Sequence, residues 1–213
     1  MKHLRQYIRQ ILLTEAAKGP SDLPDDIFVQ MKADNEFAEF QFVRKVGESE
    51  KYGPRYERAL DWDKDGIYGM IQLYLVDEEN VGPCSGAFMI SWAGATDGYG
   101  PMLYDLAMEW ATTNGSGLIA DRDTVSAEAR AVWDYYLNNR SDVEVVQLDN
   151  AYSDLTDDLK DDCDQGVAGG ANFRYPEDPE TLDDNWFEHP LSKMYRKTND
   201  SMTQELKALG KLV

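Results

Sequence analysis

The chain has 213 residues, of which 42% are hydrophobic and 11% aromatic, and its formal net charge is −19. This length and apolar content predict a folded globular protein with one well-buried core, and exclude a disordered chain. The charge argues against binding to nucleic acid, because contacts with the phosphate backbone depend on lysine and arginine. It leaves plain solubility, a basic partner, or mimicry of the charge of DNA, and charge alone favours solubility.

The cysteines and the N-terminal segment indicate the cellular compartment in which the protein acts. Cys84 and Cys163 fit neither a CxxC pair nor a zinc spacing, so we expect free thiols in a reducing compartment. The basic N-terminal segment is interrupted by Arg and Gln, unlike the apolar core of a signal peptide. No run approaches the roughly 18 apolar residues that a membrane span needs. We therefore expect a cytoplasmic protein that binds no membrane.

Hydrophobic periodicity predicts the elements in chain order. Apolar residues recur at helical spacing in 2–17, which predicts an amphipathic helix there. Strand composition follows in 26–31 and 36–47, and the strongest strand patterns are 67–77 and 85–95. The later predicted elements are a helix at about 101–114, a short strand at 117–121, a helix at 126–139 and a strand at 142–148.

This order predicts an α/β fold with a mixed central sheet flanked by helices. Residues 1–150 form the α/β domain with its extra N-terminal helix in this interpretation. Residues 151–185 contain eleven acidic residues against only Lys160 and Arg174, which predicts a long solvated loop. Apolar periodicity returns near the C-terminus, so we expect 151–213 to end in a helix that packs on the same domain.

The stretch TDGYG, residues 96–100, places two glycines between a strong strand and an amphipathic helix. Glycines allow close approach of a ligand to the backbone, and the free N–H groups at a helix start favour an anion. The same glycines are equally explained by a tight turn that needs their dihedral freedom. The dinucleotide-binding fingerprint requires a third glycine and an early strand, and this chain has neither.

Residues 85–148 resemble the core of the GNAT superfamily of N-acetyltransferases. That family places a splayed strand before an Arg/Gln-x-x-Gly-x-Gly/Ala-x-x-Leu loop and helix, and then a strand, a second helix and another strand. Gly98, Gly100 and Leu103 match the loop, whereas Ala95 stands in place of the Arg or Gln. SAEARAVWDYY resembles the family's Asn-x-x-Ala-x-x-Phe-Tyr helix, with Ala129 matching. The basic N-terminal segment and the stretches GYGPMLYDLAMEWA, VWDYY and LSKMYRK also resemble uncharacterised proteins of tailed bacteriophages.

The resemblance implies an acyl-CoA-dependent N-acyltransferase that uses acetyl-CoA. The backbone of the glycine loop would hold the pyrophosphate, and the splayed strand would pair with the pantetheine arm. The implied cofactor-binding residues are Ile90, Ser91, Trp92, Ala93, Gly98, Tyr99 and Gly100. Direct transfer to an amine needs an acid for the leaving thiolate and a base for the amine. The candidates are Tyr136 as acid and Asp121 as base, with a core aromatic and a turn residue as their alternative interpretations.

Three departures from the family pattern reduce cofactor contacts. Ala95 lacks a charge-assisted contact, Asp97 brings negative charge near the phosphate position, and Pro101 has no N–H to donate. The negative surface favours a cationic acceptor, either a small amine or a basic protein. The alternative is a non-catalytic acidic interaction protein on the same scaffold, such as a phage virion component or an inhibitor of host defence. A phage-encoded protein would act in the host cytoplasm or the virion.

The stretch DWDKDG places Asp61, Asp63 and Asp65 at the first, third and fifth positions of a calcium-binding EF-hand loop. The twelfth position is Gln72, which cannot act as a bidentate carboxylate ligand. A strand pattern follows in place of the helix that an EF-hand requires. A polar turn leading into a strand therefore explains these residues better than a metal site.

Overall fold

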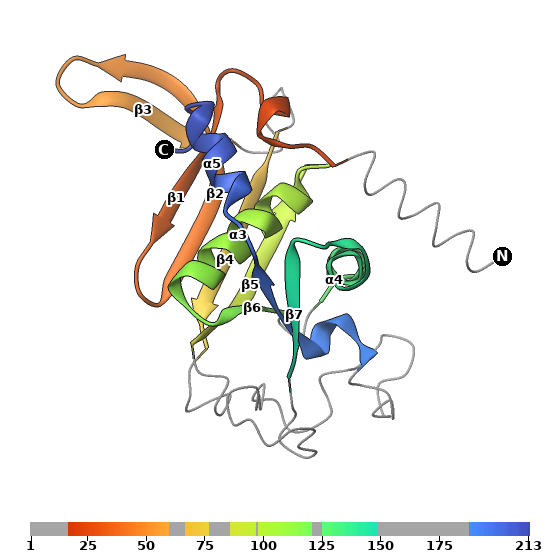
Figure 1. The fold of residues 1–213 in the computed structure, drawn as a ribbon. Helices are drawn as coiled ribbons and strands as arrows, with labels where there is room; N and C mark the ends of the chain where they lie inside the picture. The colour runs from red at the N-terminus through yellow and green to blue at the C-terminus, as the bar shows by residue number, and fades with distance from the viewer. Residues whose placement is uncertain (1–16, 60–66, 77–85, 97, 121–124, 149–187) are drawn as a thin grey trace. The chain divides into compact units, whose positions relative to one another are not determined.

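The computed structural model describes residues 17–59, 67–76, 86–96, 98–120, 125–148 and 188–213 (Figure 1). Among the described residues, strands predominate before residue 100, and helices alternate with strands after it. The strands are β1 (Ile27–Ala33), β2 (Phe37–Ser49), β3 (Gly53–Arg58), β4 (Gly69–Leu75), β5 (Ala87–Ala95), β6 (Gly117–Ile119), β7 (Val143–Gln147) and β8 (Lys193–Lys197). The helices are η1 (Pro20–Asp22), α3 (Gly100–Asn114), α4 (Ala127–Asn139), η4 (Pro190–Ser192) and α5 (Ser201–Ala208).

The strands form one mixed sheet with the order β1-β2-β4-β5-β6-β8-β7, while β3 pairs with β2. β5 and β6 are parallel, in the register Ala87↔Gly117 to Met89↔Ile119. Parallel neighbours need a crossover, and α3 lies between these two strands in the chain. β8 pairs antiparallel with both β6 and β7. The expected α/β class with a mixed sheet is therefore confirmed.

Most predicted elements match observed ones. The strand patterns at 67–77, 85–95, 117–121 and 142–148 correspond to β4, β5, β6 and β7, and the predicted helices correspond to α3, α4 and α5. Two strands, β3 and β8, were not predicted. The sequence of β8, KMYRK, places cations beside apolar residues, and its short length provides little periodic signal. The predicted helix at 2–17 and the acidic segment 151–185 lie outside the described residues, apart from Ala17.

The chain divides into two compact units. Unit 1 comprises residues 1–73, 92–107 and 200–213, and unit 2 comprises 74–91 and 108–199. In unit 1, the chain after α5 runs beside β1. The N–H of Val29 donates to Lys211 O at 2.7 Å, the N–H of Val213 donates to Val29 O at 2.9 Å, and Met31 N–H donates to Val213 O at 3.0 Å. The last described residues therefore extend the sheet edge of unit 1.

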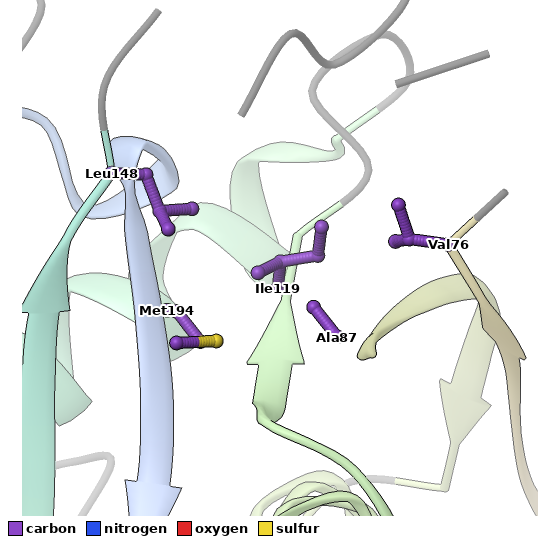
Figure 2. Packing of buried hydrophobic residues seen from close by; sticks show 5 residues of the cluster. All are labelled: Val76, Ala87, Ile119, Leu148 and Met194. Atoms are coloured by element: carbon purple, nitrogen blue, oxygen red, sulfur yellow. The ribbon is translucent and has the colours of Figure 1, made fainter. Parts of the chain in front are cut away.

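The core of unit 2 lies between strands that are far apart in the sequence. Val76, Ala87, Ile119, Leu148 and Met194 form one buried apolar cluster. Figure 2 shows these side chains converging from β5, β6 and β8 and from the ends of β4 and β7. Burial of such side chains supplies the main driving force for folding. Insertion of β8 between β6 and β7 is what brings Met194 into this cluster.

A buried ion cluster joins β7 and β8 in unit 2. The side chain of Lys197 is only 1% exposed, and its ammonium lies 2.6 Å from Asp142 Oδ2. Arg140 donates to both oxygens of the same carboxylate, at 2.7 Å each. Since a buried ammonium is costly unless paired, the Asp142 carboxylate stabilises Lys197 in its strand position.

Candidate functional site

The glycine turn lies between β5 and α3, as the sequence predicts. Gly98 has a φ of 91°, which is in the left-handed region where residues with a Cβ are strained. Gly100 is the first residue of α3, and a Cβ built there meets nothing within 4 Å. The fold therefore requires glycine at 98, whereas at 100 the small residue leaves open space over the helix start. The N–H groups in the first turn of a helix have no intrahelical acceptor and can bind an anion.

Tyr99 anchors this turn in the core of unit 1. Its hydroxyl donates to Asp22 O at 2.7 Å, and its ring packs edge-on against Phe42 with centroids 5.4 Å apart. Burial, with the charge of Asp22, raises the pKa of Tyr99. Its own N–H donates to Thr96 O at 3.1 Å, within the turn. Of the three predicted loop residues, Tyr99 thus has a structural role that occupies both its side chain and its amide.

Lys18 supplies a cation at the turn, although no lysine or arginine occurs between Lys64 and Arg122 in the sequence. The N–H of Lys18 donates to Gly98 O at 2.9 Å. The Lys18 ammonium lies 4.7 Å from the centroid of the Tyr99 ring. Lys18 itself is exposed, so its charge faces solvent beside the turn. The tertiary fold therefore places a positive charge where the local sequence offers only Asp97.

The end of β5 extends beyond its pairing with β6. The register of the two strands covers Ala87 to Met89, while β5 continues to Ala95. Ile90, the next residue, is buried, and the three residues after it, Ser91, Trp92 and Ala93, are exposed. The Trp92 ring is 39% exposed and packs edge-on against Tyr68 with centroids 5.8 Å apart. These four residues are the ones predicted to pair with an extended ligand.

A one-residue irregularity accompanies this change in exposure. Two backbone hydrogen bonds bracket the β4–β5 pairing: Thr96 N–H donates to Tyr68 O, and Val76 N–H donates to Ala87 O, both at 2.8 Å. Tyr68 and Val76 are eight positions apart, whereas Ala87 and Thr96 are nine positions apart. The segment 87–96 is therefore one residue longer than the segment 68–76 that it faces, a difference that a β-bulge accounts for. Bulges bend a strand, redirect its side chains and are common beside active sites.

Tyr136, the candidate acid, lies on α4 in unit 2. Ser126 caps this helix by accepting the N–H of Ala129 at 3.2 Å. Tyr136 is 0% exposed, its ring centroid lies 6.5 Å from that of Trp133, and the Arg140 guanidinium lies 5.2 Å from the ring. This environment is that of a core aromatic residue, which is the alternative interpretation of this position. Tyr135, the neighbouring residue, is half-buried.

Several sequence candidates lie outside the described residues. They are Asp121, Asp97, Asp61, Asp63, Asp65, Cys84 and Cys163. Within the described part of the chain, no group of three or more His, Cys, Asp or Glu side chains is placed to hold a metal ion. Among the same residues, no helix has the length and apolar character that crossing a membrane requires.

Sequence reasoning missed two kinds of residue in this region. Lys18 has no local signal, because 80 positions separate it from Gly98 and only the fold brings them together. Asp105 and Glu109 are buried on α3, where periodicity alone predicts that acidic residues face solvent.

Comparison of the chain with models of protein families, with curated proteins and with solved structures finds no match. The functional argument therefore depends on the geometry of this chain.

Proposed function

We propose that the chain is an acyl-CoA-dependent N-acyltransferase that transfers an acyl group directly to an amine. One observation carries the proposal: β5 continues as an exposed segment, Ser91–Ala93, beyond its register with β6, and then leads through a glycine turn into α3. An extended, amide-containing ligand can pair with such a strand end, and its anionic group can meet the helix start.

The chain's residues have separate roles in this proposal. Gly98 and Gly100 keep the turn open for a pyrophosphate, and Lys18 contributes the positive charge that Ala95 does not. Ser91 to Ala93 would lie along the pantetheine arm, with Ile90 as the buried end of that segment. Acetyl-CoA would supply the acyl group. The amine nitrogen forms a bond with the thioester carbonyl carbon as the carbon–sulfur bond breaks, the amine proton passes to a base, and the thiolate takes up a proton.

The acceptor proposed for this reaction is a cationic amine, because the chain has a net charge of −19. A strongly negative protein raises the local concentration of cationic ligands and their association rate. The acceptor class therefore follows from long-range charge and not from a described pocket. Small polyamines and lysine-rich peptides are the probes that this class suggests.

The central test is calorimetric titration of acetyl-CoA into the purified chain. We expect binding in the micromolar range by the unmodified chain and none by Gly100→Trp, because an indole there would fill the open space at the helix start. Gly47→Trp is the matched control, since a Cβ at Gly47 also meets nothing within 4 Å and this residue lies on β2, away from the turn. Absence of heat at high micromolar acetyl-CoA would overturn the proposal.

The role of Lys18 has its own matched pair. Loss of one charge-assisted contact, worth about 1.5–3 kcal/mol, is expected to weaken acetyl-CoA binding by roughly 10-fold or more in Lys18→Ala. Lys51→Ala is the control, because Lys51 also lies over a tyrosine ring, at 5.0 Å from the Tyr52 centroid, and carries the same charge. Equal affinities of the two variants would remove Lys18 from the site.

Tyr136 and Asp121 remain the proposed acid and base. The Tyr136→Phe variant keeps the ring and removes the hydroxyl, so we expect thiol release with a polyamine acceptor to slow by about 10²-fold or more. Tyr135→Phe, one position away on α4, is the control. An unchanged rate would assign Tyr136 to packing alone, in agreement with its complete burial.

The second candidate function is a non-catalytic, acidic interaction protein on the same scaffold. The burial of Tyr136 and the use of the Tyr99 amide by Thr96 favour it. In that case acetyl-CoA would produce no heat, and the native host lysate would provide a basic partner. The titration with acetyl-CoA therefore separates the two functions.

A further inference from the structure

Among the described residues, no strand pairs with the second edge of β3 in the hairpin of β2 and β3. From Lys45 onward β2 is exposed, and most of β3 is exposed as well. Figure 1 shows this hairpin extending past β1. Among the described residues β3 pairs with β2, on one of its two edges. A two-stranded ribbon is marginally stable in water, and an unpaired strand edge is a template for another strand.

The direction of the backbone groups along β3 is set by its pairing with β2. The N–H of Ala59 donates to Phe42 O at 3.0 Å, so this amide faces β2. Amides alternate in direction along a strand, and the irregularity in this pair lies on β2, between Lys45 and Gly47. The N–H groups of Tyr56 and Arg58 therefore face the open edge. The ring nitrogen of Pro54, which carries no hydrogen, faces the same way.

The charges of β3 are self-complementary about Tyr56. Arg55 and Glu57 flank this residue, and their side chains are 73% and 63% exposed. If two copies of β3 pair antiparallel about a two-fold axis at Tyr56, Arg55 of each copy lies opposite Glu57 of the other. That position is a non-hydrogen-bonded pair, in which Cα atoms lie about 4.5 Å apart and side chains are closest.

The backbone is compatible with the same register. The two Tyr56 residues exchange N–H···O bonds, and the N–H of each Arg58 faces Pro54 O of the other copy. Because Pro54 has no N–H, the pairing lacks only the hydrogen bond that position 54 of each copy would otherwise donate to Arg58 O of the other. Charged side chains usually protect an edge strand from association. Here the order of Arg55 and Glu57 about Tyr56 instead favours pairing with a second copy in the register centred on Tyr56.

We propose that the β3 edge is an isologous interface through which two copies of this chain form a dimer with two-fold symmetry. Charge complementarity selects the second copy as the occupant. A shift of the register by two residues would lose the paired Arg55 and Glu57 contacts. This proposal does not depend on the proposed enzyme activity.

The test uses two charge-reversal variants of the full chain and sedimentation equilibrium at about 0.15 M salt. Arg55→Glu places acidic side chains opposite each other, and Glu57→Arg places basic ones opposite each other. Each variant alone is expected to raise the dimer dissociation constant by about tenfold or more. The double variant, with both charges exchanged, is expected to dimerise like the unmodified chain.

Mixing the two single variants distinguishes the interface from an effect on folding. Arg55 and Glu57 also form a contact within one chain, at 3.4 Å, which both single variants lose. In the mixture, position 55 of each variant opposes a residue of opposite charge in the other, so native mass spectrometry should detect a heterodimer that neither variant forms with itself. Thermal unfolding checks that both variants fold. A monomer at every concentration, single variants that dimerise normally, or no heterodimer in the mixture would each overturn the proposal.

Discussion

At the scale of single residues, the same residue type has different roles at different positions. The backbone conformation at position 98 requires a glycine, whereas the conformation at position 100 does not, although both residues match one motif. Lys18 is exposed beside a turn, while Lys197 is buried in an ion cluster. The chemistry of the residue type is the same in each pair, and the surroundings determine what it does.

The two glycines are expected to differ in their contribution to stability. Gly98→Ala forces a Cβ into a left-handed conformation and should lower the free energy of unfolding by about 1–2 kcal/mol. Gly100→Ala adds a better helix former in open space and should leave stability unchanged or raise it by up to about 1 kcal/mol. Urea unfolding of both variants measures the difference. Equal losses would mean that Gly100 also has a conformational role.

Among the described charged residues of unit 2, Asp142 is expected to contribute most to stability. Asp142→Asn removes the negative charge that lies 2.6 Å from the buried Lys197 ammonium, and the expected loss is about 3 kcal/mol in the free energy of unfolding at pH 7. Glu48→Gln is the control, because its pair with Lys45 is exposed and should contribute less than about 1 kcal/mol. Similar losses for the two variants would contradict the assignment.

The effect of Asp142 should also depend on pH. The hydrogen bond from Arg140 lowers the pKa of Asp142; burial opposes this, and the bond from Lys197 adds to the lowering. A group with a depressed pKa stabilises the fold above its unfolded value, about 3.9 for Asp, and this stability is lost as the pH falls. The difference in the free energy of unfolding between the unmodified chain and Asp142→Asn should therefore be largest at neutral pH and shrink below about pH 4.

At the scale of elements, strands distant in the sequence complete each unit. In unit 2, β8 lies between β6 and β7 and contributes Met194 to the buried cluster (Figure 2). In unit 1, the chain after α5 pairs with β1, and the Lys211 ammonium donates to Pro24 O and Ile27 O. Each of these segments satisfies backbone groups that would otherwise lie at a strand edge.

Removal of residues 211–213 is expected to weaken unit 1. It deletes three backbone hydrogen bonds to β1, each contributing about 0.5–1.5 kcal/mol, so the expected loss is about 2–4 kcal/mol. Hydrogen exchange should accelerate at the Val29 and Met31 amides, which donate two of these bonds, to Lys211 O and Val213 O. Lys211→Ala is the control, since it removes the ammonium and keeps the backbone. Unchanged protection of Val29 and Met31 in the truncated chain would contradict this pairing.

At the scale of the whole molecule, the net charge of −19 is the dominant feature. Like charges on one compact chain repel and oppose folding, and salt screens this repulsion. We therefore expect the thermal midpoint to rise as NaCl increases from about 0.01 M to about 1 M, over which the screening length falls from about 30 to 3 Å. The rise should be smallest near pH 4.3, the isoelectric point. A midpoint that falls with salt at pH 7 would mean that attractive ion pairs dominate.

The sequence by itself determined the mixed α/β class and most of the elements, because apolar periodicity and turn residues act over a few neighbouring positions. It also located the glycine turn before α3, whereas the exposure of Ser91 to Ala93 on β5 is seen in the structure. Hydrophobic patterning could not predict β3 or β8, whose short, charged segments become strands through pairing with β2 and with β6 and β7.

Only the tertiary structure decided which distant residues meet. It placed Lys18 at Gly98, gave Lys197 its partner Asp142, and buried Tyr136 completely. None of these contacts could be predicted from local sequence patterns. Backbone pairing and burial bring together residues that are far apart in the chain, and such contacts leave no periodic pattern in the sequence. The charge that the glycine turn lacks in its own sequence is therefore supplied by the fold.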